Sequence, residues 1–282
     1  MNESLSGRQF RALLLTAGTA PIFTGTCGLS WAMVLPASLL ACGVVSGMYA
    51  LVPGAPAKLL RAVFAAALLV LTVWAGKRTA PAFPETARSA PAACLILALA
   101  ALAAGRGAAV LGRCAGVLIW ILAGLYGVVL AFGFTQINTE WLRPEWNWRD
   151  LPKAALLLLP AAALPLRGRT EGKKGSGLSL LTLAALAVSA SMITGASLSP
   201  VLAREPMSFL TLARSVSILG VIQRFEALIS AALLMSGFCL CALLYGSLRE
   251  EFLHLFGERR GRRGYLAAVA SSLAISCLTG QF

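Results

Sequence analysis

The chain has 282 residues, of which 58% are hydrophobic and only 12% are charged, and its mean hydropathy is +0.80. A soluble protein of this length would need many more charged side chains to cover its exterior. These values exclude a soluble globular domain and predict an integral membrane protein with many spans.

The net charge of +13 at pH 7 does not indicate nucleic-acid binding. A basic face is typical of nucleic-acid-binding proteins, but here the 24 Lys and Arg fall mainly in short gaps between apolar runs. That placement is typical of the charges that orient membrane spans. We therefore expect the lipid bilayer as a partner, and no nucleic acid.

The apolar runs predict an all-α, polytopic membrane helix bundle. A spanning helix needs about 20 mostly apolar residues, and on this criterion we expect about nine spans in a single transmembrane permease-like domain, residues 1–282. We expect the segment 199–221 to be an amphipathic connector. The expected spans are 10–28, 30–52, 57–76, 89–104, 108–135, 152–167, 178–198, 222–248 and 263–280.

The basic clusters predict the orientation of the bundle. The densest clusters lie in 167–174 and 259–263, and an even number of expected spans separates each of them from the N-terminus. The positive-inside rule therefore favours a cytoplasmic N-terminus. The loop 135–150 would lie on the opposite side, and its tryptophans are typical of an interfacial aromatic belt, Trp141, Trp146 and Trp148.

No residue pattern indicates an enzyme, a metal site or a cofactor. We find no Ser-His-Asp, Cys-His or paired-carboxylate arrangement, and the seven cysteines stand almost entirely in apolar segments, where cysteine is usually a small buried side chain. Cys239 and Cys241 would point about 200° apart on a helix, so they do not easily share a metal ion. The only histidine, His254, stands in a charged segment. We expect no catalytic activity and no bound cofactor.

The sequence Gly18-Thr19-Ala20-Pro21 interrupts the first expected span and is a candidate ligand-binding site. A helix that breaks in the middle of the membrane exposes amide and carbonyl groups that can hold a small charged ligand. The alternative is an ordinary kink, because Gly and Pro are common in membrane helices.

Arg224 and Glu226 stand where the eighth expected span begins. Charged groups at such depth are costly unless they reach water or a partner. They could form a gating or coupling pair that faces the bundle interior, or they could extend to the membrane surface and fix the orientation of the helix. Residues two positions apart lie on different helix faces, so we expect each to have another partner.

Several motifs occur in an order that resembles one family. Ser89-Ala90-Pro91 opens a span, and Gly107 precedes Arg113 by six residues. Asn138 is followed by Leu142-Arg143-Pro144. The most specific stretch is Gln223-Arg224-Phe225-Glu226-Ala227, preceded by Gly195 and Pro206. Together they resemble the spore germinant receptor B subunits, the GerAB-like spore permeases of the amino acid–polyamine–organocation superfamily.

The resemblance implies a LeuT-like bundle of two inverted five-helix repeats, with a ligand site at broken helices one and six. It implies a nutrient sensor for a small amino acid in the spore inner membrane, with A-type and C-type receptor subunits as partners. A tenth helix of the family is not seen, and the sixth expected span is almost purely Leu, Ala and Pro. Two alternatives therefore stay open, a secondary transporter of amino acids or amines and a scaffold subunit that binds no ligand.

Overall fold

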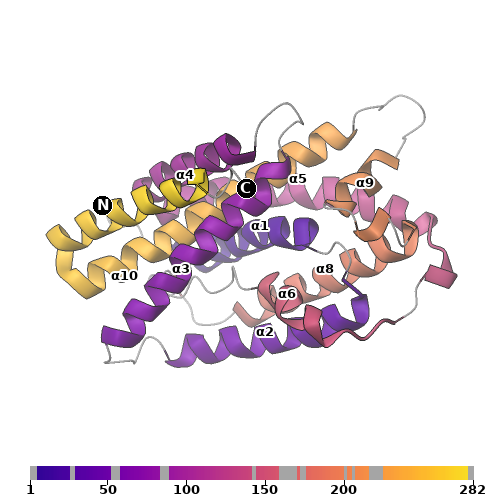
Figure 1. The fold of residues 1–282 in the computed structure, drawn as a ribbon, viewed down its shortest axis with the longest axis horizontal. Coiled ribbons are helices and arrows are strands. Elements are labelled where there is room, and N and C mark those ends of the chain that lie inside the picture. The colour runs from indigo at the N-terminus through magenta and orange to yellow at the C-terminus, as the bar shows by residue number, and fades with distance from the viewer. Residues whose placement is uncertain are drawn as a thin grey trace.

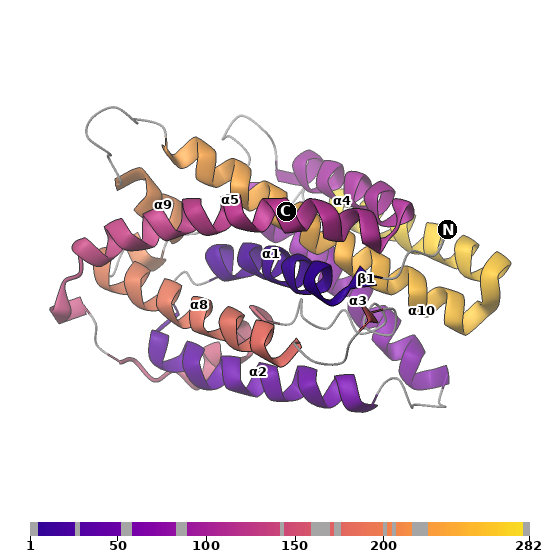
Figure 2. The same cartoon turned by 180° about the vertical axis from the view of Figure 1, so that it is seen from behind.

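The structure is a computed structural model, and in the residues that it describes every element of regular secondary structure is a helix except one pair of two-residue strands. Figures 1 and 2 show helices packed side by side in one elongated bundle. The described residues are 5–25, 29–51, 58–82, 89–141, 144–158, 170–171, 176–199, 202–204, 207–215 and 225–278.

Most expected spans are confirmed as helices. The helix 108–135 was predicted to the residue, whereas of the expected span 152–167 only a six-residue helix is seen, and 159–167 lies outside the described residues. Short 3₁₀ turns occupy Ala80–Ala82 (η2), Thr139–Trp141 (η3), Trp148–Asp150 (η4) and Leu202–Arg204 (η6). The helices are α1 (Gly7–Gly25), α2 (Trp31–Leu51), α3 (Lys58–Thr79), α4 (Ser89–Arg106), α5 (Ala108–Thr135), α6 (Leu151–Leu156), α8 (Ser176–Ser197), α9 (Ser208–Ser215) and α10 (Phe225–Leu278).

The outer surfaces of the helices are suited to lipid. Among the described residues, four helical segments are long and apolar enough to cross a membrane, namely 61–82, 108–135, 178–197 and 225–278. On α5, Trp120 is 79% exposed and Val117 is 66% exposed. Large apolar side chains exposed along a whole helix would be unfavourable in water. These features are consistent with a membrane-embedded helix bundle.

Helix α10 consists of two helices joined at a sharp turn. Gly257 has φ 73° and ψ 177°, a backbone conformation that favours glycine. The two parts then run back along one another, and a Cβ atom on Gly261 would lie only 2.6 Å from the carbonyl oxygen of Phe252. Separate spans with a loop over 249–262 were expected. Instead the helices extend through this polar segment, because Arg, Glu and Leu are strong helix formers.

Helix α1 occupies the middle of the bundle. It packs against α10, α5 and α8, and Figure 2 shows it between α5 on one side and α8 on the other. Every residue from Thr16 to Gly25 is buried. Helix α2 packs on α8 and α6, and α10 covers α3 and α4. A helix enclosed on several sides is the natural place to look for a site in such a bundle.

Two distant segments meet at one end of the bundle. Strand β1 (Leu5–Ser6) pairs in parallel with β2 (Thr170–Glu171), with Leu5 opposite Thr170. The orientation predicted from basic residues places the N-terminus and the 167–174 segment on the same side of the membrane. The strand pair is consistent with that relation.

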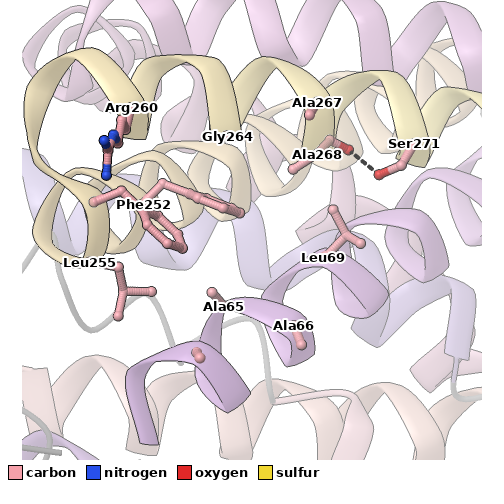
Figure 3. A pocket seen from close by; sticks show the side chains of 12 residues that line it. Ala65, Ala66, Leu69, Phe252, Leu255, Arg260, Gly264, Ala267, Ala268 and Ser271 are labelled. Atoms are coloured by element: carbon pink, nitrogen blue, oxygen red, sulfur yellow. Dashed lines mark hydrogen bonds between the residues drawn. The ribbon is translucent and has the colours of Figure 1, made fainter. Parts of the chain in front are cut away.

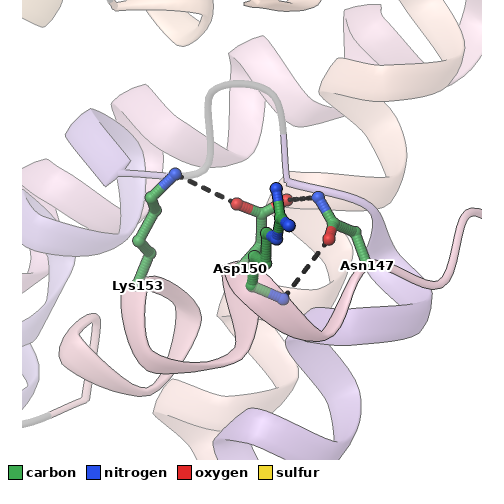
Figure 4. Close-up of polar contacts among 4 residues, drawn as sticks. Asn147, Asp150 and Lys153 are labelled. Carbon is green, nitrogen blue, oxygen red and sulfur yellow. Dashed lines mark hydrogen bonds and ion pairs between the residues drawn. The ribbon is translucent and has the colours of Figure 1, made fainter.

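A network of polar side chains holds η4, the turn that precedes α6 (Figure 4). The Asn147 side chain donates from Nδ2 to Oδ2 of Asp150 at 2.8 Å, and its Oδ1 accepts from the backbone N–H of Arg149 at 3.3 Å. Lys153 Nζ donates to Oδ1 of Asp150 at 3.0 Å. These contacts fix the turn that carries Trp146 and Trp148, which are both exposed with ring centroids 6.3 Å apart. Exposed tryptophans on one loop are consistent with an interfacial belt.

Candidate functional site

The sequence Gly18-Thr19-Ala20-Pro21 lies within a continuous helix. Helix α1 runs through Pro21 to Gly25, so of the two alternatives the break is not present, and Pro21 lies inside a continuous helix. Proline lacks a backbone N–H, so the carbonyl of Ala17 loses its partner four residues on. Neighbouring helices hold this region in place, which explains why one proline does not end the helix. A site built from exposed main-chain groups on both sides of a break is therefore not seen.

The four residues also face different neighbours. A Cβ atom on Gly18 would lie 2.6 Å from a methyl carbon of Leu183, so Gly18 permits close contact between α1 and α8. Ala20 and Pro21 are buried as well. Because successive residues on a helix point about 100° apart, the four cannot line one pocket together. Only Thr19 among them belongs to a polar cluster.

The buried polar cluster joins α1 to α10. Thr19 Oγ1 and Ser236 Oγ lie 2.6 Å apart. Both hydroxyls also donate toward the carbonyl oxygen of Thr16, Thr19 at 2.8 Å and Ser236 at 2.6 Å. We name Thr16, Thr19 and Ser236 the hydroxyl cluster. Thr16 itself uses its Oγ1 to contact the Ala115 carbonyl of α5 at 3.4 Å, so three helices meet here.

The hydroxyl cluster has more contacts than protons. Three short oxygen–oxygen contacts link the two hydroxyls and the Thr16 carbonyl, but Thr19 and Ser236 carry one hydroxyl proton each. At any moment one of the three contacts therefore has no proton, and lone pairs remain available. The cluster is suited to accept a hydrogen bond from an added donor.

An aromatic group adjoins the cluster. The ring of Phe23 lies 4.2 Å from that of Tyr126 and 4.1 Å from that of Phe209, measured between centroids. These rings come from α1, α5 and α9. The Tyr126 hydroxyl lies near Thr19, but it is buried without reaching hydrogen-bonding geometry with any described residue. A buried donor without a partner is costly, so this hydroxyl is a second polar group with unused capacity.

Sequence reasoning missed Thr16, Tyr126 and Ser236. Thr16 and Thr19 are three residues apart and share one helix face, and that spacing could have been noticed. Ser236 and Tyr126 gave no such signal, because only tertiary packing brings them to α1.

Glu226 has a partner from the connector, whereas Arg224 lies outside the described residues. Arg214 of α9 donates from Nε to Oε2 of Glu226 at 2.6 Å. Both side chains are partly exposed, Arg214 at 58% and Glu226 at 42%. Glu226 therefore has a partner other than Arg224, as we expected. The ion pair attaches α9 to the first turn of α10.

A buried carboxylate lies near the turn of α10. Glu251 is only 2% exposed, and its Oε2 has no hydrogen-bond partner among the described residues. Arg61 of α3 and His254 are near enough to interact with its charge. No group of three His, Cys, Asp or Glu side chains in the described part of the chain is arranged to hold a metal ion.

Comparison with protein-family models and with curated proteins finds no match to this chain.

Proposed function

We propose that the protein is a membrane subunit of a spore nutrient-germinant receptor that senses a small amino acid and signals through A-type and C-type partner subunits. The proposal draws its class from the motif order described above and its site from the hydroxyl cluster. It includes a LeuT-like arrangement of about nine spans, with the N-terminus in the cytoplasm and the protein in the spore inner membrane.

The observation that carries the ligand proposal is the excess of acceptors around Thr19. The hydroxyl oxygens of Thr19 and Ser236 each keep lone pairs that can accept, whereas the Thr16 carbonyl already accepts from both hydroxyls. An ammonium group has three N–H donors. A buried charge is tolerated only when it is well hydrogen-bonded. The amino group of an amino acid would therefore suit this cluster, with the aromatic group beside its side chain.

The same geometry provides a means of signalling. Thr19 and Ser236 bond directly to one another across α1 and α10. A ligand donor inserted between them would separate the two helices. Because a ligand shifts an equilibrium toward the conformation that it binds better, this separation would favour a second arrangement of α10. Glu226 and Arg214 would transmit the shift to α9, and Arg224 would act with them in coupling.

The experiment is amino-acid binding to the purified protein. Radiolabelled glycine, alanine, serine and valine are tested in turn against the wild type and the Thr19→Val and Ser236→Ala variants. Loss of charge-assisted hydrogen bonds predicts an affinity lower by about tenfold or more in each variant. Thr72→Val is the matched control, because Thr72 is also a buried threonine but bonds only to Leu68 O of its own helix among the described residues.

Equal amino-acid affinity in the Thr19, Ser236 and Thr72 variants would show that the hydroxyl cluster is not the binding site.

Uptake into proteoliposomes separates sensing from transport. Accumulation driven by an ion gradient favours the secondary transporter, and binding without flux favours the sensor.

A ligand-free scaffold is the second candidate, and one observation favours it. Gly18 packs so closely on Leu183 that a methyl group could not be added without movement, and the hydroxyl cluster is closed on itself by bonds of 2.6 to 2.8 Å. A tightly packed interior of this kind needs no ligand for stability. Co-purification with A-type and C-type subunits, together with no binding of any tested amino acid, would support this function.

A further inference from the structure

An apolar groove of about 660 Å³ lies between α3 and the two parts of α10. One wall is formed by Ala62, Ala65, Ala66 and Leu69 of α3. These positions share one helix face. Three of them are alanines, whose side chains are short and extend little into the groove. The opposite wall includes Ala267 and Ala268 of the second part of α10, while the ring of Phe252 from the first part packs against Gly264. Small side chains on both walls leave room for a guest.

The groove has one charged end. Arg260 lines it beside the turn of α10, and Ser271 lies at the other end (Figure 3). Among the described residues Arg260 forms no ion pair, whereas the nearby Arg262 pairs with Glu258 at 2.9 Å. The guanidinium of Arg260 is thus the available cation at the mouth of an otherwise apolar groove.

The length of the groove fits one leaflet of a bilayer. From Arg260 to Ser271 the helix rises roughly 16 Å, at 1.5 Å per residue. The hydrocarbon core of a bilayer is about 30 Å thick, so one leaflet contributes about half of that. A ligand with an anionic group at one end and an apolar chain as long as one leaflet would match both the charge of Arg260 and the length of the groove.

We propose that this groove binds one anionic glycerophospholipid, with its phosphate at Arg260 and an acyl chain along the alanines of α3. Arginine recognises phosphate well because its planar guanidinium can donate two hydrogen bonds to one phosphate. The site is independent of the proposed amino-acid site. It lies on the α3–α10 face, whereas the hydroxyl cluster is enclosed between α1, α5 and α10. A lipid so held would link the turn of α10 to α3.

The test uses native mass spectrometry of the full chain in detergent, with phosphatidylglycerol and phosphatidylcholine of identical acyl chains. We expect the wild type to retain phosphatidylglycerol in preference to phosphatidylcholine. Loss of an arginine–phosphate contact predicts an affinity for phosphatidylglycerol lower by about tenfold in Arg260→Gln. Arg259→Gln removes the same charge outside the groove and should change the affinity by less than about twofold.

A second pair of variants tests the acyl chain. Ala66→Trp fills the groove, whereas Ala67→Trp places the same bulk at the next exposed position of α3, outside the groove. Lipid retention should be lost only in Ala66→Trp, and Ala267→Phe should reproduce the loss from the opposite wall. Glycerol 3-phosphate, which has no acyl chain, should not displace the lipid.

Three results would overturn the proposal. The first is an equal effect of Arg259→Gln and Arg260→Gln, which would mean charge attraction without a site. The second is displacement of bound phosphatidylglycerol by glycerol 3-phosphate that is as effective as displacement by added phosphatidylglycerol. The third is unchanged lipid retention in Ala66→Trp together with a change of oligomeric state by light scattering, which would make the groove a protein interface.

Discussion

The hydroxyls of Thr19 and Ser236 lie 2.6 Å apart in the interior of the bundle, although 217 positions separate them in the chain. This contact joins the first helix to the longest one and is buried on both sides. Both hydroxyls also bond to the Thr16 carbonyl. The two helices are thereby held in one register by a small polar group inside an apolar core, where its hydrogen bonds are shielded from water.

Gly18 is predicted to be a packing residue. Gly18→Leu would place a branched side chain where a Cβ atom alone lies 2.6 Å from Leu183. Overpacking of this kind lowers the free energy of unfolding by about 1–3 kcal/mol, which thermal unfolding in detergent would measure. Gly124→Leu is the control, because nothing lies within 4 Å of a Cβ atom there. Partial rescue of Gly18→Leu by Leu183→Ala is expected, and its absence would contradict the assigned contact.

Glu251 is predicted to lower the stability of the fold. Its carboxylate is 2% exposed and has one oxygen without a hydrogen-bond partner among the described residues. Glu251→Gln removes the buried charge at nearly constant shape and should raise the free energy of unfolding by about 1 kcal/mol. Glu258→Gln, at an exposed residue paired with Arg262, should change it by less than about 0.5 kcal/mol. A loss of stability in Glu251→Gln would mean that attraction to Arg61 outweighs the cost of burial.

Cys94 and Cys277 are predicted to form a disulfide under oxidation. Their sulfur atoms lie 3.0 Å apart as free thiols, one on α4 and one near the end of α10. A mild oxidant would accept two electrons and two protons from the pair as the bond forms. Peptide mapping without reductant should then find the two cysteines linked. Cys277→Ser should abolish the link. If Cys94 instead formed a disulfide mainly with another cysteine, α4 would not lie beside the end of α10.

The Arg214–Glu226 ion pair is predicted to contribute little to stability. The two atoms are 2.6 Å apart, but both side chains are partly exposed, Arg214 at 58% and Glu226 at 42%. A double-mutant cycle of Arg214→Gln and Glu226→Gln should give a coupling energy of about 0–1 kcal/mol, which decreases as salt is added. A coupling above about 2 kcal/mol that does not respond to salt would show that the pair is desolvated and structurally dominant.

The sequence predicted the features of the fold that depend on the length and hydrophobicity of a single segment. The apolar run 108–135 became α5 with the same bounds, because length and hydrophobicity alone determine whether a segment can span a bilayer. The turn of α10 was placed too broadly, over a whole charged segment. The turn lies at Gly257, the residue that adopts a positive φ. The sequence has several glycines in this segment and does not show which of them makes the turn.

The candidate site was predictable only in part. Thr19 stood out as part of Gly18-Thr19-Ala20-Pro21, for which we weighed a broken helix against an ordinary kink, and α1 is continuous through Pro21. Whether a proline breaks a membrane helix depends on the neighbours that satisfy the freed backbone groups. The helices that α1 contacts most are α5, α8 and α10, and all of them are distant in sequence.

The sequence by itself determined that this protein is a bundle of apolar helices suited to a membrane, because composition and run length act within each segment. Only the tertiary structure decided that Thr19 meets Ser236, that Glu226 meets Arg214, and that the alanines of α3 face Arg260. Each of these contacts joins separate helices. Which helix faces meet is set by side-chain packing between helices rather than by hydrophobicity, and no single stretch of the chain contains that information.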